Sequence, residues 1–467
     1  MRHTLKRAVN TFLGTFNTSP VQGFVFLLAI CTAASTGCCF SQQPSITATS
    51  GPATTETYHG TPQKYLFGDW GGERTKLEEK GVAFDFHYVV DALSDVSGGQ
   101  AQANTAWGRI RGTTDIDFGK LANLHGTTFH ATGMYQYGAN LGGQYIGSLT
   151  NPSGIVSAHS LRLDSWWLQQ SLVHDKLIFR AGQFAGQDSY GVREYGASFL
   201  SEPMGYAFGN LFGTVYESFD PAGTPAVEVR VVPTRNYYFK TAVLSGNRNP
   251  YSQDANGFHF AIKNAPVFVS EVGYIVNPPA GATSTRTLGP RAGTMRGLLT
   301  GTYKVGSVYN PGKFTDPLDG NTSKGNYLIY AEAAQAVYRR AATGEDAMRG
   351  LDLTVGYDWS PSDVNKLNTE LTVGARYTGL IPHRDSDQLA LGFIHNQVSS
   401  HFDTPATGLT PAQTFGSEQV IELSYRSLIK PWLVFQPDFQ YYVKPGAVNN
   451  STIGNAVVLG FRTKVTF

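Results

Sequence analysis

Residues 455–467 read NAVVLGFRTKVTF, and this stretch decides the fold because its side chains alternate in character. Successive side chains of a β-strand point to opposite faces. One face of the stretch is apolar and carries Val457, Leu459, Phe461, Val465 and Phe467. The other face carries Gly460, Arg462, Lys464 and Thr466. A strand of a soluble sandwich can show the same pattern, so the stretch alone predicts a strand and leaves its surroundings open.

The rest of the chain repeats this pattern in a way that favours a membrane. Alternating segments of about ten residues recur, their polar faces carry whole charges, and aromatic residues stand at their ends, as in outer-membrane barrels. A final aromatic residue on the apolar face is typical of the last strand of such a barrel, which pairs with the first strand so that no edge remains. We therefore expect an all-β fold, a transmembrane antiparallel β-barrel.

The composition agrees with this expectation and restricts the function. The 467 residues include 36 Lys and Arg and 35 Asp and Glu, and the net charge of +1 argues against a nucleic-acid surface and against a strongly ion-attracting pore. Charged residues make up only 15% of the chain, whereas the 52 Gly and the 12% of aromatic residues are high. A mean hydropathy of -0.20 suits a barrel that is apolar outside and wet inside, and suits a secreted β-protein almost as well.

Residues 1–40 are predicted to be an export signal. A basic start with Arg2 precedes the short apolar core 24–30, and small residues follow this core. Cleavage is expected between about residues 33 and 43. All three cysteines lie before position 40, so the mature chain has neither a disulfide framework nor a cysteine metal site. Beyond the signal, no apolar run is long enough to span a bilayer as a helix.

Two short segments are expected between the signal and the barrel. Residues 41–64 are rich in Ser, Thr, Pro and Gly and predict a flexible periplasmic lead-in. Residues 65–81 are expected to contain a short helix at 75–80, followed by Gly81, the residue best suited to a left-handed C-cap. The barrel is then expected to occupy residues 82–467.

Alternation gives about seventeen candidate strands. Bacterial barrels of one chain take an even number of strands, and the weakest candidate is 258–263. We therefore expect roughly sixteen strands, a size that leaves an aqueous channel. Residues 184–224 show little alternation and form a long excursion, which is usually functional. This loop either folds into the lumen or covers the mouth of the barrel.

Blocks at both ends of the chain resemble the carbohydrate-selective porin (OprB) family. The first block is GDWGGER at 68–74, with Leu77, Gly81, Tyr88, Asp91 and Gly98-Gly99. The later blocks are GLIPHR at 379–384 with Asp387, then Ser417, Glu418, Glu422 and Tyr425, then QPDFQY at 436–441 with Pro445. The blocks are specific in combination, although His383 stands where a small residue is expected before the arginine. The resemblance implies an outer-membrane channel of a Gram-negative bacterium through which glucose-type sugars diffuse passively, without catalytic residues, cofactor or metal.

The polar faces of the strands hold the candidate site. A charged side chain facing lipid at mid-depth costs roughly 2–4 kcal/mol, so these faces are expected to point into water. Carboxylates and guanidinium groups hydrogen-bond to sugar hydroxyls, and aromatic rings stack on sugar faces. The pore-lining and sugar-contacting candidates are Asp91, Arg162, Arg180, Glu370, Arg376, Arg384, Glu418, Glu422, Arg426, Gln436, Asp438, Gln440 and Arg462. Opposite charges on a barrel wall can also simply pair and stiffen it.

Other hypotheses stay open at this point. The channel could be a general diffusion porin without sugar selectivity, and a soluble adhesin or a secreted glycoside-processing β-protein is a further alternative. Glu418 and Glu422, four positions apart on one strand, would lie about 13 Å apart, too far for either glycosidase geometry. Common hydrolase and phosphate-binding motifs are absent from the sequence.

The expected partners follow from the membrane hypothesis. They are small neutral carbohydrates, outer-membrane lipid and lipopolysaccharide, and the barrel-assembly machinery, which would read the last strand ending at Phe467. Nucleic acid is not expected. A homotrimer is one option, because trimerisation needs a flattened apolar outer wall that alternation alone does not reveal.

Overall fold

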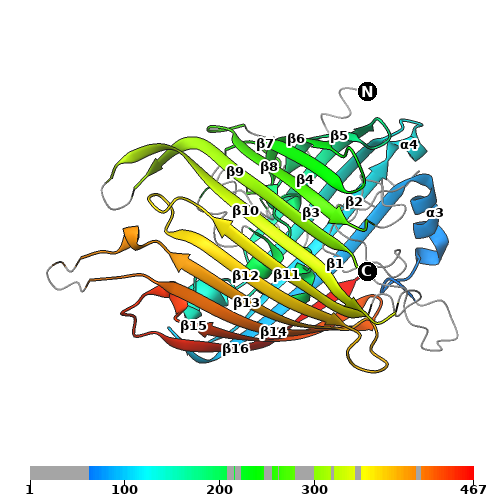
Figure 1. Ribbon diagram of the computed structural model, residues 1–467. Helices are drawn as coiled ribbons and strands as arrows, with labels where there is room; N and C mark the ends of the chain where they lie inside the picture. The colour runs from blue at the N-terminus through cyan, green and yellow to red at the C-terminus, as the bar shows by residue number, and fades with distance from the viewer. Residues whose placement is uncertain are drawn as a thin grey trace, which may run out of the picture.

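The computed structural model describes residues 63–207, 215, 222–246, 255–260, 262–278, 299–316, 320–341, 349–405, 407 and 412–467. In this part of the chain, sixteen antiparallel strands form one closed barrel (Figure 1). The expected fold class is therefore confirmed. The predicted export signal lies outside the described residues, as does the lead-in up to residue 62.

Each strand pairs with its neighbours in sequence, and the last strand closes the barrel against the first. The strands are β1 Val82–Gly99, β2 Asn104–Asp117, β3 Thr127–Gly138, β4 Ser160–Leu172, β5 Leu177–Phe184, β6 Thr224–Val231, β7 Tyr237–Leu244, β8 Val267–Val276, β9 Gly301–Thr315, β10 Thr322–Arg339, β11 Gly350–Trp359, β12 Leu367–Thr378, β13 Gln388–Val398, β14 Ser417–Lys430, β15 Leu433–Val443 and β16 Gly454–Thr466. The register of β16 on β1 runs from Thr466 opposite His87 to Gly454 opposite Gly99. The terminal stretch therefore has the closing role predicted for it.

Strand β2 had no counterpart among the alternating segments, and the described residues of 258–263 form no strand. The absence of a strand in the described residues of 258–263 agrees with its place as the weakest candidate, so the overlooked β2 is the error, while the expected number of roughly sixteen strands is confirmed. Strand β2 escapes notice because its outer face holds Gly108 and Gly112, which add no hydrophobic signal. A Cβ at Gly108 would lie 2.7 Å from the ring of Tyr137, and one at Gly112 would lie 3.0 Å from the ring of Phe86. The neighbouring aromatic rings thus supply the apolar surface that β2 itself lacks.

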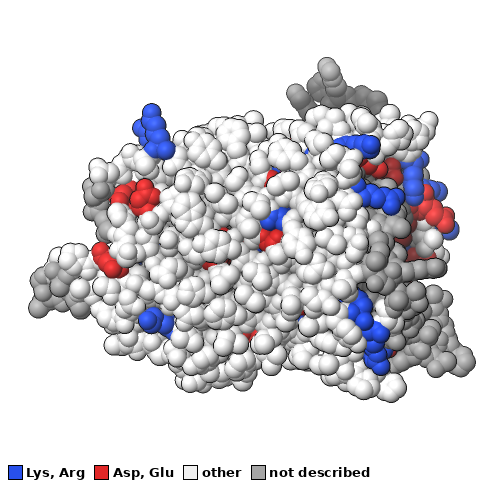
Figure 2. Space-filling view, viewed as in Figure 1, with Lys and Arg blue, Asp and Glu red and all other residues white. Residues whose placement is uncertain are grey.

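The two faces of the wall differ as the alternation predicts. Outward residues such as Leu391 and Leu459 are exposed, whereas inward acids such as Glu370 and Glu418 are buried. Charged side chains are sparse on the middle of the outer wall and gather toward its ends (Figure 2). No helix in the described ranges has the length and apolar character needed to cross a membrane.

Short helical elements occupy the ends and the interior of the barrel. They are η1 Trp70–Gly72, α3 Glu73–Lys80, α4 Phe118–Leu121, η2 Gly142–Ile146, η3 Gly186–Asp188, η4 Gly196–Ser198, α5 Glu202–Gly205, η6 Ser400–Phe402 and η7 Pro445–Ala447. Helix α3 begins two residues before the expected start and ends at Lys80. Gly81 follows with φ 110° and donates its N–H to the carbonyl oxygen of Leu77 at 3.0 Å, which closes the helix as expected.

The orientation follows from the lengths of the connections. The segment before β1 and the end of β16 lie at one rim of the barrel, beside α3 (Figure 1). Short turns 173–176, 232–236 and 431–432 lie at the same rim, together with one long connection, 277–300, whereas the opposite rim carries the long connections 139–159, 185–223 and 245–266. Outer-membrane barrels have short periplasmic turns and longer extracellular loops. We therefore assign the rim with α3 to the periplasm.

Candidate functional site: a lumen narrowed by two inward loops

The first loop, residues 139–159, is fixed to the inner wall by hydrogen bonds to candidate residues. The backbone N–H groups of Leu149 and Thr150 donate to the Glu418 carboxylate, each at 2.8 Å. The hydroxyl of Ser153 donates to Asp91 at 2.6 Å. The side-chain amide of Gln440 donates to the carbonyl oxygen of Pro152 at 2.9 Å. Because Asp91, Glu418 and Gln440 all lie on inward faces, this loop lies inside the barrel.

The second loop begins at residue 185, and its described residues up to 207 also lie in the lumen. The Glu422 carboxylate accepts the backbone N–H of Leu200 at 2.5 Å and the hydroxyl of Ser201. On another part of the wall, the N–H of Gly191 donates to Glu271 at 3.0 Å. The choice between a lumen loop and a mouth cover is thereby decided, because these acceptors are wall residues that face inward.

Arg193 is the single Lys or Arg of the loop 185–223, and it is held by buried acids of the wall. Its guanidinium donates to the carbonyl oxygen of Pro203 at 2.7 Å, to Asp358 at 2.9 Å and to Glu370 at 3.5 Å. The side chain of Arg193 is 1% exposed and both carboxylates are 0% exposed. A Cβ at Gly356 of β11 would lie 1.6 Å from Nη1 of Arg193, so only glycine leaves room for this guanidinium.

Apolar contacts fix the second loop against the wall as well. Phe199, Leu200 and Met204 pack in one buried cluster with inward residues that include Ala390 and Ile394 of β13. A glycine of the wall again makes room for the loop, since a Cβ at Gly392 would lie 2.9 Å from the ring of Phe199. Burial of large apolar side chains stabilises such a contact by about 1.5–3 kcal/mol each. The loop is thus held by packing in addition to hydrogen bonds.

The structure separates the candidate residues by exposure. Those that are buried at the wall or under a loop are Asp91, Arg162, Arg180, Glu370, Glu418, Glu422, Gln436, Asp438 and Gln440. Among these, Arg180 pairs with Glu228 at 2.9 Å, Gln436 donates to the hydroxyl of Ser424 at 2.9 Å, and Asp438 accepts from Gln440 at 2.8 Å. Arg376, Arg426 and Arg462 are half-buried. Direct contact of any of them with a sugar remains a prediction.

Arg384 lies apart from the other candidates. It belongs to the connection between β12 and β13 at the periplasmic rim, where it pairs with Asp387 at 2.7 Å and contacts Ser427. Asp387 also accepts the hydroxyl of Tyr425 at 2.6 Å. His383 has a φ of 64°, a left-handed conformation that side chains rarely adopt. The GLIPHR block therefore forms a tight turn at the periplasmic rim. It does not face the two loops inside the lumen.

Two half-buried arginines form paired contacts with acids on adjacent strands. Arg462 donates to both carboxylate oxygens of Asp91, each at 2.7 Å. Arg376 donates twice to Asp352, at 3.1 Å and 2.6 Å. Bidentate pairs of this kind are strong and geometrically specific. They arrange fixed charges of both signs around the water-filled space, as a channel for polar solutes requires.

Sequence reasoning missed two residues of the second loop, Arg193, which contacts the wall, and Glu202, which contacts the first loop. Arg193 and Glu202 stand in a Gly- and aromatic-rich segment without alternation, where no local pattern indicates which way a side chain points. One signal was available: Arg193 is the single Lys or Arg between residues 185 and 223. The wall partners of Arg193 are more than a hundred residues away on β11 and β12, and the partner of Glu202 is Asn151 of the first loop, so neither contact could be read locally.

Glu202 predicts a pH response of the two loops. It is 9% exposed and accepts a hydrogen bond from the side-chain amide of Asn151 at 2.6 Å, which joins the second loop to the first. Burial raises the pKa of Glu202 to about 8, with Glu370 adding to the shift. The contribution of Glu202 to loop packing is therefore full below its ordinary pKa and is lost as the pH rises through about 8.

We expect the single-channel conductance to rise as the pH passes from neutral to alkaline, because an ionised buried carboxylate loosens the loops. Glu202→Gln should keep the amide contact and remove this step. Planar-bilayer recordings over a pH series measure both. The same alkaline rise in the Glu202→Gln channel would show that another group is responsible.

Comparisons with known proteins agree with this geometry. Residues 101–467 match the model of the carbohydrate-selective porin, OprB family. Porin B of Pseudomonas aeruginosa is 25% identical over 445 residues, which cover 86% of this chain and 91% of the relative. The putative porin QuiX of Acinetobacter baylyi is 22% identical over 434 residues, which cover 87% of this chain and 93% of the relative.

Solved structures share the fold. A high-pH structure of Pseudomonas putida OprB superposes with a TM-score of 0.75 at 21% identity, and it covers 88% of this chain and 100% of that chain. A low-pH structure of the same protein gives a TM-score of 0.55 at 16% identity over 87% of this chain.

Proposed function

The chain belongs to the carbohydrate-selective porin (OprB) family, and from that premise we propose that it passes neutral monosaccharides of the glucose type down their gradient. It is an outer-membrane, sugar-selective channel. The finer assignment concerns which sugars pass, by which mechanism and with which partners.

One observation carries the proposal: two loops lie inside a sixteen-strand barrel and are anchored on buried carboxylates of its wall. A barrel of this size leaves an aqueous channel, so loops inside it reduce the width available to a solute. The inward groups that stay half-buried include Arg376, Arg426, Arg462 and Gln388. The ring of Tyr195 lies against the guanidinium of Arg376. Weak contacts at several such groups favour entry and still permit exit.

Liposome swelling tests the proposal. We expect vesicles that carry the protein to swell faster in glucose than in sucrose or in the protonated amino sugar glucosamine. Glucosamine has nearly the size of glucose, so it reports on charge, and sucrose reports on size. Equal rates in all three solutes would reduce the protein to a general diffusion porin.

We propose that passage involves no covalent step. A glycoside-processing mechanism would need carboxylates free to act on a glycosidic bond. Glu418 and Glu422 instead accept backbone N–H groups of the two loops, and each is 0% exposed. Release of sugar from a glycoside by the purified protein would contradict this part of the proposal.

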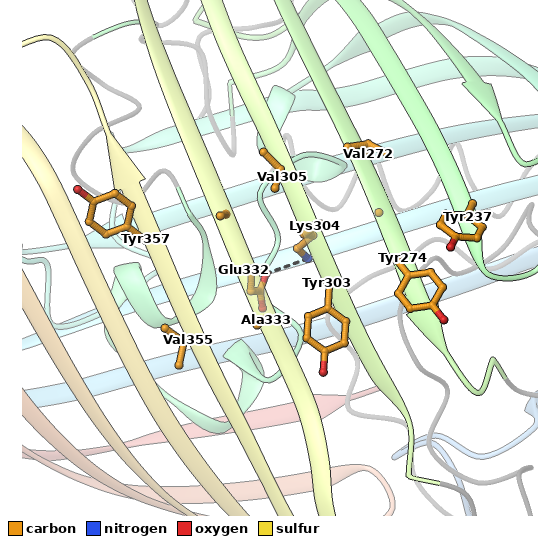
Figure 3. A pocket seen from close by; sticks show the side chains of 12 residues that line it. Tyr237, Val272, Tyr274, Tyr303, Lys304, Val305, Glu332, Ala333, Val355 and Tyr357 are labelled. Atoms are coloured by element: carbon orange, nitrogen blue, oxygen red, sulfur yellow. Dashed lines mark ion pairs between the residues drawn. The ribbon is translucent and has the colours of Figure 1, made fainter.

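The partners proposed from the sequence gain support from the outer surface. A shallow hollow of about 440 Å³ lies on the outer wall across β7 to β11, with Tyr237, Tyr274, Tyr303 and Tyr357 among its lining residues (Figure 3). Its apolar lining suits contact with acyl chains of lipid and lipopolysaccharide. A homotrimer would need a flat apolar contact on this same kind of surface, and chemical cross-linking in native membranes would detect it.

Recognition of the last strand by the assembly machinery is proposed to precede closure. In the closed barrel, the ring of Phe67 stacks on that of Phe467 at 5.4 Å, and the N–H of Phe467 donates to Phe86 at 2.8 Å. Strand β16 is also paired on both sides. The last strand, which ends at Phe467, is therefore accessible to the assembly machinery only before the barrel closes.

A further inference from the structure

Arg426 of β14 is a lumen cation for which the residues that the structure describes supply no ion-pair partner. Ile421 and Leu423 are exposed on the outer face, so the alternate positions 422, 424 and 426 face inward. Within the described part of the chain, the Arg426 side chain has no ion pair and no hydrogen bond, whereas Arg376 and Arg462 each pair with an aspartate. The residue as a whole is half-buried on this inward face.

The charged groups that act on Arg426 are mostly cations. They are the cations Arg376, Arg462 and Lys464 and one acid, Asp387. Both oxygens of Asp387 are already used, by Arg384 at 2.7 Å, by the hydroxyl of Tyr425 at 2.6 Å and by the N–H of Leu428 at 3.0 Å. The positive charge of Arg426 is therefore not neutralised by its surroundings. Arg376 and Arg462 are each paired with an aspartate, so of these three guanidinium groups Arg426 is the one whose charge lacks a paired acid among the described residues. Holding that charge beside other cations costs energy unless an anionic ligand compensates for it.

The strand register places these cations in a compact patch. Arg426 lies opposite Gln388 of β13 and, by continuation of the β14–β15 register, opposite Gln436 of β15. Gln436 in turn lies opposite Arg462 of β16. Neighbouring strands are about 4.8 Å apart, so Arg426 and Arg462 stand roughly 10 Å apart with Gln436 between them. Arg376 of β12 lies opposite Ala390 of β13, two residues along that strand from Gln388.

The second loop overhangs this patch and adds groups that suit a sugar. The ring of Tyr195 lies over the Arg376 guanidinium at 4.1 Å. The hydroxyl of Ser198 donates to Oε1 of Gln388 at 2.8 Å. Arg462 also reaches the loop, with Nη1 at 3.5 Å from the carbonyl oxygen of Phe199. The patch thus combines cations, amides and an aromatic ring on the periplasmic side of the narrowed region.

We propose that Arg426, flanked by Arg376 and Arg462, forms a subsite for the carboxylate of a sugar acid. The inference deepens the proposed function and rests on it, because the ligand must first enter the lumen as a sugar does. A guanidinium group matches the two oxygens of a carboxylate, which a compact ammonium does less well. The side-chain amides of Gln388 and Gln436 provide donors and acceptors for hydroxyl groups nearby. Sugar acids therefore pass through the channel by pausing at this subsite.

Current block in planar bilayers tests the subsite, with D-gluconate as the probe and glucose as its neutral counterpart. We expect Arg426→Gln to raise the half-blocking concentration of gluconate relative to that of glucose by roughly tenfold, the size expected for loss of one charged hydrogen bond. Arg426→Lys should give an intermediate value. Arg340→Gln makes the same charge change at an exposed position next to β10 and serves as the control. Heat-modifiable migration of every variant confirms a folded barrel.

The outcomes distinguish the two proposals. A gluconate-to-glucose ratio that is the same in the unaltered protein and in Arg426→Gln would overturn the subsite and leave the sugar channel intact. An equal loss of chloride selectivity and of gluconate block would also overturn the subsite, since it would indicate only a positive field. Failure of the unaltered protein to pass glucose would instead contradict the proposed function.

Discussion

Replacing Arg193 by alanine is expected to widen the pore, with a several-fold rise in single-channel conductance and loss of the preference for glucose over sucrose. Arg193 holds the second loop by three contacts, to Pro203 within the loop and to Asp358 and Glu370 on the wall. Without the guanidinium, two fully buried carboxylates lose the cation that pairs with them. Breaking a buried ion pair in this way costs about 3–5 kcal/mol, and movement of the loop into water relieves that cost.

A second variant reaches the same result without removing a charge. Gly356→Ala would place a methyl group 1.6 Å from Nη1 of Arg193, so the guanidinium or the wall must move. Arg340→Ala at the periplasmic rim removes an exposed arginine and should leave the conductance unchanged. Bilayer recordings and liposome swelling measure the effects. Unchanged conductance in folded Arg193→Ala and Gly356→Ala barrels would show that the second loop does not limit passage.

Replacing Arg74 by alanine is expected to weaken closure of the barrel strongly. The Arg74 side chain is 1% exposed and donates to the carbonyl oxygens of Phe467 at 2.9 Å and of Phe84 at 3.0 Å. Its guanidinium lies between the rings of Tyr65 at 3.4 Å and Trp70 at 4.6 Å. The GDWGGER block therefore connects the end of β16 to the start of β1. Loss of charged hydrogen bonds and cation–π contacts should cost roughly 2–4 kcal/mol.

The midpoint of heat-modifiable migration on a detergent gel measures this effect. Arg74→Ala should lower the midpoint clearly. Lys76→Ala is the matched control on the same helix, because Lys76 forms only an exposed pair with Glu73, and such pairs contribute about 0–1 kcal/mol. Equal midpoints for the two variants would contradict a closing role of Arg74.

The outcome for particular elements shows where sequence reasoning succeeds and fails. The terminal strand was predicted to pair with the first because its amphipathic pattern leaves an edge that a membrane cannot tolerate, and β16 does pair with β1. Strand β2 was missed because two of its outward positions are Gly108 and Gly112, which have no apolar side chain. The rings of Tyr137 and Phe86 on neighbouring strands cover these positions. A search for alternation considers the residues of one strand at a time, so it cannot detect apolar side chains that neighbouring strands contribute.

The candidate site divides along the same line. Alternation by itself determined that Glu418, Glu422 and Arg426 face the lumen, since that property depends only on positions two residues apart in one strand. Tertiary structure alone decided that Glu418 and Glu422 hold loops whose residues lie more than two hundred positions away, while Arg426 finds no ion-pair partner among the described residues. The sequence therefore determined the barrel and the direction of its side chains. Which inward groups are covered and which meet the solute depends on contacts between distant segments, and these exist only once the chain has folded.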